Sequence, residues 1–159
     1  MTVLPVVQLR AVELSPTTSA YVAGIIDGEG CITLNRYRPP RTDLSVRYTP
    51  LVQVGNTNSD LTTMLQRSFG GHVNVRPGTT THRTCFVWVI TGPGAGVTLR
   101  TVREHLQLKR PQCDLLLEYL DGFRSFRGGP RTRRVAADEL ARRERIYLGL
   151  KALNRTGPR

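Results

Sequence analysis

Two periods of hydrophobic residues alternate along this chain. In some stretches apolar residues recur every three to four positions, which is typical of a helix with one buried side; in others they recur every second position, which is typical of a half-buried strand. The first helical stretch has a capping residue at Thr17 or Thr18 and ends at Gly28 and Gly30. Its apolar positions are Tyr21, Val22, Ile25 and Ile26.

Strand-like and helical stretches then follow in a regular order. Strands are predicted over residues 31–38, 47–54, 72–76 and 84–91. A helix capped by Asn58 or Ser59 separates the second strand from the third and ends at Gly70 and Gly71. After the fourth strand come a turn over residues 92–96, a helix reaching to Leu106, a helix that opens at Pro111, and a last helix over about 135–153. Strand pairs that alternate with helices predict an α+β fold with an antiparallel sheet.

One face of this sheet is expected to lie under the helices and the other to face water or a ligand. Ile32 and Leu34 alternate with polar residues on the first strand, and Val52 and Val54 alternate with Thr49, Leu51 and Gln53 on the second. The fourth strand leaves two choices open, because both of its alternating sets are apolar. The inward set is either Cys85, Val87 and Val89 or Phe86, Trp88 and Ile90.

The domain organisation is expected to be simple. Residues 1–16 read as an N-terminal arm, 17–126 as the core, and 127–159 as a basic C-terminal helical extension of the same domain. The hydrophobic content of 39% suits a folded core rather than a disordered chain. No apolar run is long enough to span a bilayer, and we expect no secretory leader and no membrane partner.

The charge balance points to a polyanionic partner. Lysine and arginine total 23 against 12 aspartates and glutamates, which gives a formal net charge of +11 and favours nucleic acid. Only Lys109 and Lys151 are lysines, and arginine suits both phosphate and guanine edges. Its codons also suit a GC-rich source, such as an archaeon, bacterium or phage, better than an organelle. Three cysteines without a C-x-x-C pair indicate a reducing, intracellular and cytoplasmic setting.

The first helix carries a stripe of small residues. Ala20, Gly24 and Gly28 are spaced by four, so one side of the helix has almost no side chains and a second helix can approach it closely. The end of the helix then presents the carboxylate of Glu29. Two copies of the chain joined along this stripe would place two carboxylates together, which is costly unless a cation lies between them. Such a pair suits metal-dependent cleavage of a phosphodiester.

Residues 22–30, read as VAGIIDGEG, resemble the motif of LAGLIDADG homing endonucleases, and the resemblance runs from Thr18 to about Phe126. It implies an αββαββα core with an antiparallel, saddle-shaped DNA-binding sheet and additional C-terminal helices. Because only one motif is present, it also implies a homodimer joined through the motif helices. The implied activity is a Mg²⁺-dependent double-strand break with short 3′ overhangs at a long pseudo-palindromic DNA site, for which Mn²⁺ or Ca²⁺ can replace Mg²⁺ in binding.

The resemblance also implies roles for individual residues. Glu29 and the carbonyl of Gly28 would hold the metal, and Asp27, at the first acidic position, would act near it and support the helix pair. Asn56 would order active-site water, and Lys109 falls on the family's active-site lysine. One departure is Glu29 where many relatives have aspartate. Another is Asp60, which stands where a basic residue is frequent, so that activity is reduced or another arginine such as Arg67 is recruited.

The polar face of the sheet supplies a candidate DNA-reading set, because arginine, asparagine and glutamine match base edges in the major groove. On the strands the set is Thr33, Asn35, Tyr37, Arg47, Thr49, Gln53, Asn74 and Arg76. Loops are expected to add Arg36, Arg38, Arg41 and Arg83 at outer bases or phosphates.

Two other functions stay open: an RNA maturase that assists intron splicing, and a non-catalytic DNA-binding protein with the same fold. The glycine-rich residues 92–96 do not match a phosphate-binding loop, so no nucleotide cofactor is expected.

Overall fold

The structure is a computed structural model that describes residues 13–40, 44–124 and 135–155. Its helices and strands come in the order predicted from the sequence. They are α1 (Pro16–Glu29), β1 (Gly30–Tyr37), β2 (Arg47–Asn56), α2 (Ser59–Phe69), β3 (His72–Arg76), β4 (Cys85–Thr91), α3 (Gly92–Val102), the short 3₁₀ helix η1 (Arg103–His105), α4 (Arg110–Arg124) and α5 (Ala137–Arg155).

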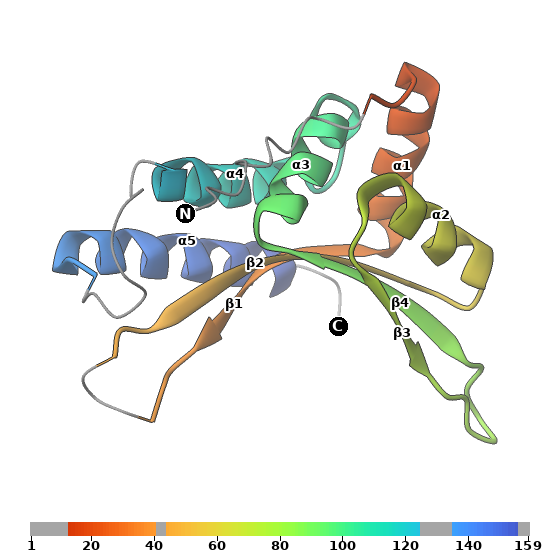
Figure 1. Ribbon diagram of the computed structural model, residues 1–159, viewed down its shortest axis with the longest axis horizontal. Helices are drawn as coiled ribbons and strands as arrows, with labels where there is room; N and C mark the ends of the chain where they lie inside the picture. The colour runs from red at the N-terminus through yellow and green to blue at the C-terminus, as the bar shows by residue number, and fades with distance from the viewer. Residues whose placement is uncertain (1–12, 41–43, 125–134, 156–159) are drawn as a thin grey trace, which may run out of the picture.

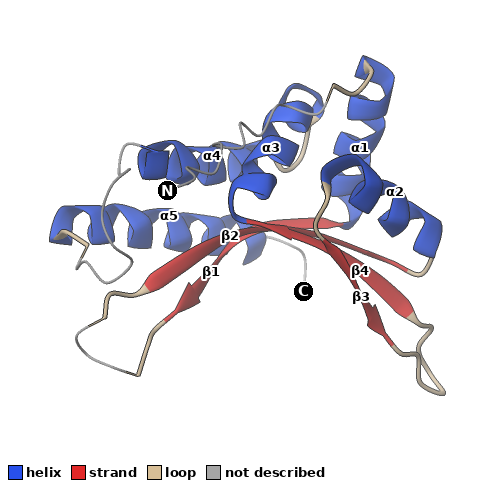
Figure 2. Ribbon diagram, viewed as in Figure 1, coloured by secondary structure: helices blue, strands red, loops and turns tan. Residues whose placement is uncertain are grey.

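The four strands form one antiparallel sheet in the order β1-β2-β4-β3. The helices lie on one side of it, and the two hairpins splay apart below them, so that the helix-free face is arched (Figure 1). Figure 2 shows the same separation of a helical layer from a strand layer. The predicted α+β class and its saddle-shaped sheet are therefore confirmed. Within the described ranges, no helix combines the length and apolar character needed to span a membrane.

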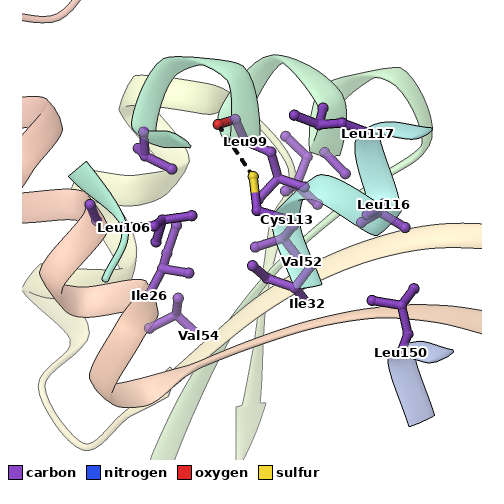
Figure 3. Packing of buried hydrophobic residues seen from close by; sticks show 14 of the residues in the cluster. Ile26, Ile32, Val52, Val54, Leu99, Leu106, Cys113, Leu116, Leu117 and Leu150 are labelled. Atoms are coloured by element: carbon purple, nitrogen blue, oxygen red, sulfur yellow. Dashed lines mark hydrogen bonds between the residues drawn. The ribbon is translucent and has the colours of Figure 1, made fainter. Parts of the chain in front are cut away.

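The core lies between the sheet and the helices. Ile32 from β1 and Val52 and Val54 from β2 are fully buried under Ile26 of α1 and Leu99 of α3, as Figure 3 shows. The thiol of Cys113 in α4 donates to the carbonyl of Leu99 across this core. Burial, followed by the nearby charge of Asp114, raises the pKa of Cys113 to about 12, so this thiol is a packing group.

The start of α1 lies earlier than the sequence pattern predicted. Ser15 is the N-cap: its hydroxyl accepts the Thr18 N–H at 3.1 Å, and Pro16 occupies the first turn. Thr17 and Thr18 are therefore inside the helix, and the prediction that one of them caps it was wrong. The pattern could not decide because several hydroxyl residues are adjacent there, whereas Pro16 fits a first helical position, where no N–H partner is needed.

The fourth strand resolves the ambiguity that its sequence left open. Trp88 is fully buried in the main core and Ile90 is nearly so, whereas Val87 and Val89 face the helix-free side. The indole N–H of Trp88 donates to the carbonyl of Gly70 at 2.8 Å, which joins the strand to the end of α2. The inward set is therefore Phe86, Trp88 and Ile90.

The expected turn over residues 92–96 is the first part of helix α3, so the prediction of a turn was wrong. The helix starts at Gly92 and ends at Val102, so that Leu106 follows it rather than belonging to it. The glycines serve close packing. A Cβ on Gly96 would meet Leu120 at 2.9 Å, and a Cβ on Gly94 would meet Ile90 at 2.8 Å. Tertiary contacts thus override the low helix propensity of glycine.

The C-terminal helix α5 packs beside β1 and α4 (Figure 1). Its Glu144 receives an ion pair from Arg36 of β1 and a hydrogen bond from the hydroxyl of Tyr48 in β2. Burial and then this hydrogen bond raise the pKa of Tyr48 to about 12, so the phenol stays a neutral donor. The division into an arm, a core and an extension stays a prediction, because residues 1–12 and 127–134 lie outside the described ranges.

The turn between α2 and β3 gives a test of the fold. Gly70 and Gly71 both have φ of +80°, but only at Gly71 would a Cβ collide with the backbone, at 2.4 Å from the carbonyl oxygen of Val89. Both Gly70→Ala and Gly71→Ala should lose about 1–3 kcal/mol through backbone strain. Gly71→Ala should lose clearly more, as measured by chemical unfolding. Equal losses would show that the approach to Val89 does not constrain the turn.

Candidate active site and nucleic-acid interface

Helix α1 has two contrasting sides. Val22, Ala23 and Ile26 are completely buried against the core. The opposite side is exposed at Ala20, Gly24 and Gly28, and a Cβ added at either glycine would meet nothing within 4 Å. The small-residue stripe predicted from the sequence is therefore an open surface of the single chain.

Glu29 lies at the end of this open side. Its side chain is exposed and has no hydrogen-bond or ion-pair partner among the described residues. The chain enters β1 at Gly30, which pairs with Val54 near the end of β2. The carboxylate of Glu29 is thus presented at the end of the sheet where α1 and β1 meet and β2 ends.

Asp27 is held in a different way from Glu29. One oxygen of its carboxylate accepts the N–H of Gln107 at 2.7 Å, and the other accepts the N–H groups of Leu108 and Lys109 at 3.2 and 2.9 Å. Both oxygens are therefore committed to the backbone of the segment before α4. The two acidic residues of the motif differ in environment: Glu29 is open and Asp27 is occupied.

The side chain of Lys109 also contacts Asp27. Its ammonium group donates to the backbone carbonyl of Asp27, two residues before Glu29. The positive charge of Lys109 also reaches Cys31 at the start of β1, where it partly offsets the burial that raises the pKa of this thiol. The structure therefore brings Lys109 to Asp27 at the end of α1, although the two residues are more than 80 positions apart in sequence.

Asn56 is the last residue of β2 and lies at the same end of the sheet. Its side-chain oxygen accepts the N–H of Asn58 at 2.8 Å, and Asn58 in turn caps α2 through the N–H of Asp60 at 2.8 Å. Asp60 lies in the first turn of α2, where a negative charge is stabilised by the helix dipole. Arg67 lies in the last turn, about 10 Å further along the axis, and its recruitment in place of a basic group at position 60 stays a prediction.

One chain offers few protein ligands for a metal ion in its described part. In the described part of the chain, no three residues among histidine, cysteine, aspartate and glutamate come together to form a ligand set. One chain offers the exposed carboxylate of Glu29 and the carbonyl of Gly28, both hard oxygen ligands that suit Mg²⁺ or Ca²⁺. The donor chemistry fits a divalent cation.

The strand residues of the predicted DNA-reading set share the helix-free face of the sheet. The pairing register joins Asn35 to Thr49 and Tyr37 to Arg47 on one hairpin, and Arg76 to Cys85 on the other. Because side chains alternate between faces, the register places the whole set on this arched surface. Its members are Thr33, Asn35, Tyr37, Arg47, Thr49, Gln53, Asn74 and Arg76.

Of the four arginines that were predicted to make contacts from loops, the structure describes three. Arg36 lies on the helix-covered side, where its guanidinium pairs with Glu144 and stacks at 4.6 Å over the ring of Tyr147, so its assignment to the DNA surface is corrected. Arg83 is exposed in the β3–β4 loop, and Arg38 is exposed just beyond β1. Arg41 lies outside the described residues.

The sequence did not predict an apolar centre on this polar face. Leu51, Val87 and Val89 form a small cluster there, although no helix covers them. Their cross-strand neighbours include Thr33, which pairs with Leu51, and Gln53, which pairs with Val89. The sequence of β4 did show apolar residues on both of its faces. They could be assigned to the helix-free face only after the structure showed which set points inward.

Charge is segregated between the two layers. The four strands contain no aspartate or glutamate, and no described carboxylate pairs with Arg47, Arg76 or Arg83. Many arginines on the helical side are instead bound to acids. The pairs are Arg100–Asp121, Arg103–Asp114, Arg110–Glu104, Arg142–Glu139, Arg143–Glu139 and Arg145–Glu118. The arginines of the arched face therefore keep a charge that no nearby acid offsets, an arrangement suited to a phosphate backbone.

Comparison with known proteins identifies the fold. No family model matches the chain, and no curated protein matches it. Among solved structures, the archaeal intron-encoded homing endonuclease I-Vdi141I, complexed with DNA, is similar with a TM-score of 0.69 and 17% identity over 90% of this chain and 87% of that one. The homing endonuclease I-CvuI, in complex with target DNA in the presence of Mg, gives 0.54 and 21% over 89% and 97%.

A third similar structure belongs to a longer chain, of which this chain covers less than half. The LAGLIDADG homing endonuclease I-GzeII, in complex with its DNA target, gives a TM-score of 0.60 and 13% identity over 88% of this chain but only 44% of that one. At these identities the likeness establishes the fold. The chain has the fold of LAGLIDADG homing endonucleases, the family whose motif residues 22–30 resemble, and it contains that fold once.

Proposed function

We propose that the protein is a homodimeric, site-specific DNA endonuclease of the LAGLIDADG type. The observation that carries the proposal is the open, side-chain-poor face of α1, which ends at the exposed carboxylate of Glu29. Lys109 binds the backbone carbonyl of Asp27, two residues earlier. The similar solved structures that are homing endonucleases bound to DNA support the class of activity.

A second copy of the chain is the partner that suits the open face of α1. Two helices can approach closely where Ala20, Gly24 and Gly28 leave room for backbone contact, and Tyr21 beside them is 58% exposed. A two-fold axis between the helices would bring two Glu29 carboxylates together and complete the ligand set. The coverage of 44% of I-GzeII agrees with a chain that supplies half of a functional unit.

The residues at the end of α1 suit hydrolysis of a phosphodiester. Glu29 and the Gly28 carbonyl of each copy would hold Mg²⁺, which supplies Lewis-acid activation of water and of the leaving oxygen. Lys109, whose ammonium group donates to the carbonyl of Asp27 two residues before Glu29, would stabilise charge that develops on the phosphate. Asn56 would orient water through the part of its amide that the α2 cap leaves free. A double-strand break with short 3′ overhangs follows from the resemblance.

The arched face would bind double-stranded DNA in the major groove. Its polar side chains can contact base edges, and Arg38 and Arg83 at the ends of the hairpins can contact phosphates or outer bases. Two-fold symmetry of the protein would require a pseudo-palindromic target. Many arginines of the helical layer are paired with acids, which favours the arched face over the helical layer as the nucleic-acid surface.

The dimer proposal predicts the effect of bulk on α1. Gly24→Leu should separate the helices, because the side chain would fill the space reserved for the partner, and sedimentation at micromolar concentration should then show a monomer. Ala152→Leu adds similar bulk to an exposed position of α5 and should leave the dimer intact. A wild-type monomer that cleaves DNA at full rate would rule out the dimer.

The proposed DNA surface predicts an effect that depends on position rather than on charge alone. Arg76→Ala on the arched face should weaken specific binding by about 1–3 kcal/mol if the guanidinium contacts a base. Arg145→Ala removes the same charge from the helical layer, where Arg145 pairs with Glu118, and should have little effect. Gel-shift titrations at two salt concentrations measure both. Equal losses would place the DNA elsewhere or make the contact purely electrostatic.

The cleavage proposal predicts that binding and cutting separate at Glu29. Glu29→Gln keeps the size of the side chain but removes the charge that would hold the cation, so cleavage should be lost while DNA binding stays at least as tight. Glu13→Gln makes the same change at an exposed position before α1 and should cut normally. Cleavage and gel-shift assays in Mg²⁺ and in chelator test this. Full activity of Glu29→Gln would refute the carboxylate-pair mechanism, and binding without cleavage by the wild type would favour a non-catalytic binder.

A further inference from the structure

The contacts of Asp27 suggest a role that differs from that of its neighbour Glu29. Three consecutive backbone N–H groups, those of Gln107, Leu108 and Lys109, point at one carboxylate at 2.7–3.2 Å. Hydrogen bonds to an ionised acceptor are stronger than neutral ones, so three of them fix the path of a short loop firmly. The loop is joined to α1 even though about 80 residues separate them.

This carboxylate also replaces the ordinary cap of α4. Lys109 is the residue before the helix, and its carbonyl accepts the N–H of Cys113 at 3.0 Å. The residue at the third helical position of a capping box normally reaches back to the N–H of the cap residue. Gln112 stands at that position, yet its side-chain oxygen is buried without a partner in the described part of the chain. The N–H of Lys109 is already taken by Asp27.

The side chain of Lys109 closes the arrangement. Its ammonium group donates to the backbone carbonyl of Asp27, so the carboxylate holds the backbone of Lys109 and the carbonyl holds its charged end. Glu29 follows Asp27 by two residues on the same turn of α1. The relative position of Lys109 and Glu29 is thus set through Asp27.

We infer that Asp27 is a positioning residue that fixes Lys109 relative to Glu29 and does not itself bind the metal or the DNA. The expected effect of Asp27 on cleavage rests on the proposed function, whereas the hydrogen-bonded geometry does not. Because α1 also carries the open face, the same contacts join the proposed dimer surface to the lysine. A change at Asp27 should therefore act on cleavage only by displacing Lys109.

Hydrogen exchange tests the geometric half without any nuclease activity. In the wild type the amides of Gln107, Leu108 and Lys109 should be protected, because each donates to Asp27. Asp27→Asn replaces one acceptor oxygen by a donor, so at least one of these amides should exchange about tenfold faster or more. Asp121→Asn removes an equivalent charge from the Arg100 pair and should leave the three amides unchanged. Unaltered exchange in Asp27→Asn would overturn the inference.

A double-mutant cycle tests the functional half. Single-turnover cleavage at saturating DNA should fall about tenfold or more in Asp27→Asn, with DNA affinity unchanged. Added to Lys109→Met, the same substitution should cause no further loss, because both act through one side chain. Losses that multiply would show that Asp27 has a role of its own and would overturn the inference.

The outcomes separate this inference from the proposed function. A wild type that never cuts DNA refutes the endonuclease, while hydrogen exchange still decides whether Asp27 holds the loop. If Asp27→Asn does not fold, Asp27→Ser keeps one acceptor for a backbone N–H and should show intermediate exchange and intermediate cleavage. Wild-type exchange and cleavage in Asp27→Ser would contradict the inference.

Discussion

The carboxylate of Asp27 binds three backbone N–H groups of the segment before α4, and much of the site depends on this contact. It joins the end of α1 to the helical layer while the other side of α1 stays open. Three of the about four acceptor sites of this carboxylate are used by the backbone, so it has little left to offer a ligand. The division of labour between two acids in one motif follows: Asp27 organises the interior, and Glu29, two residues later, is left exposed.

Charge follows the same separation into layers. The helical side carries nearly all of the described acids, and they neutralise the arginines around them, whereas the sheet has arginines and no acid. Exposed pairs of this kind add little stability. The strand arginines differ from them, because no acid on the sheet offsets their charge.

The parts of the fold that could be predicted are those that depend on the spacing of residues close together in the sequence. The bounds of β3 and the face occupied by Arg47 and Arg76 follow from a period of two, and the stripe on α1 follows from a spacing of four. Partners distant in sequence could not be predicted. Arg36 resembles a loop contact until Glu144, 108 residues away, is seen to hold it. The same holds for the amides bound by Asp27, and for β4, whose two faces are equally apolar.

Selection of cleavable sites from a randomised DNA library, in Mg²⁺ and in chelator, tests the central claim most directly. The account predicts that the protein cuts only with the metal and that the recovered sites consist of two half-sites related by two-fold symmetry. Each half should be read by one copy of the arched face. Recovery of no cut sequence in any divalent metal, or of a single site without symmetry, would contradict a homodimeric endonuclease built around two copies of α1.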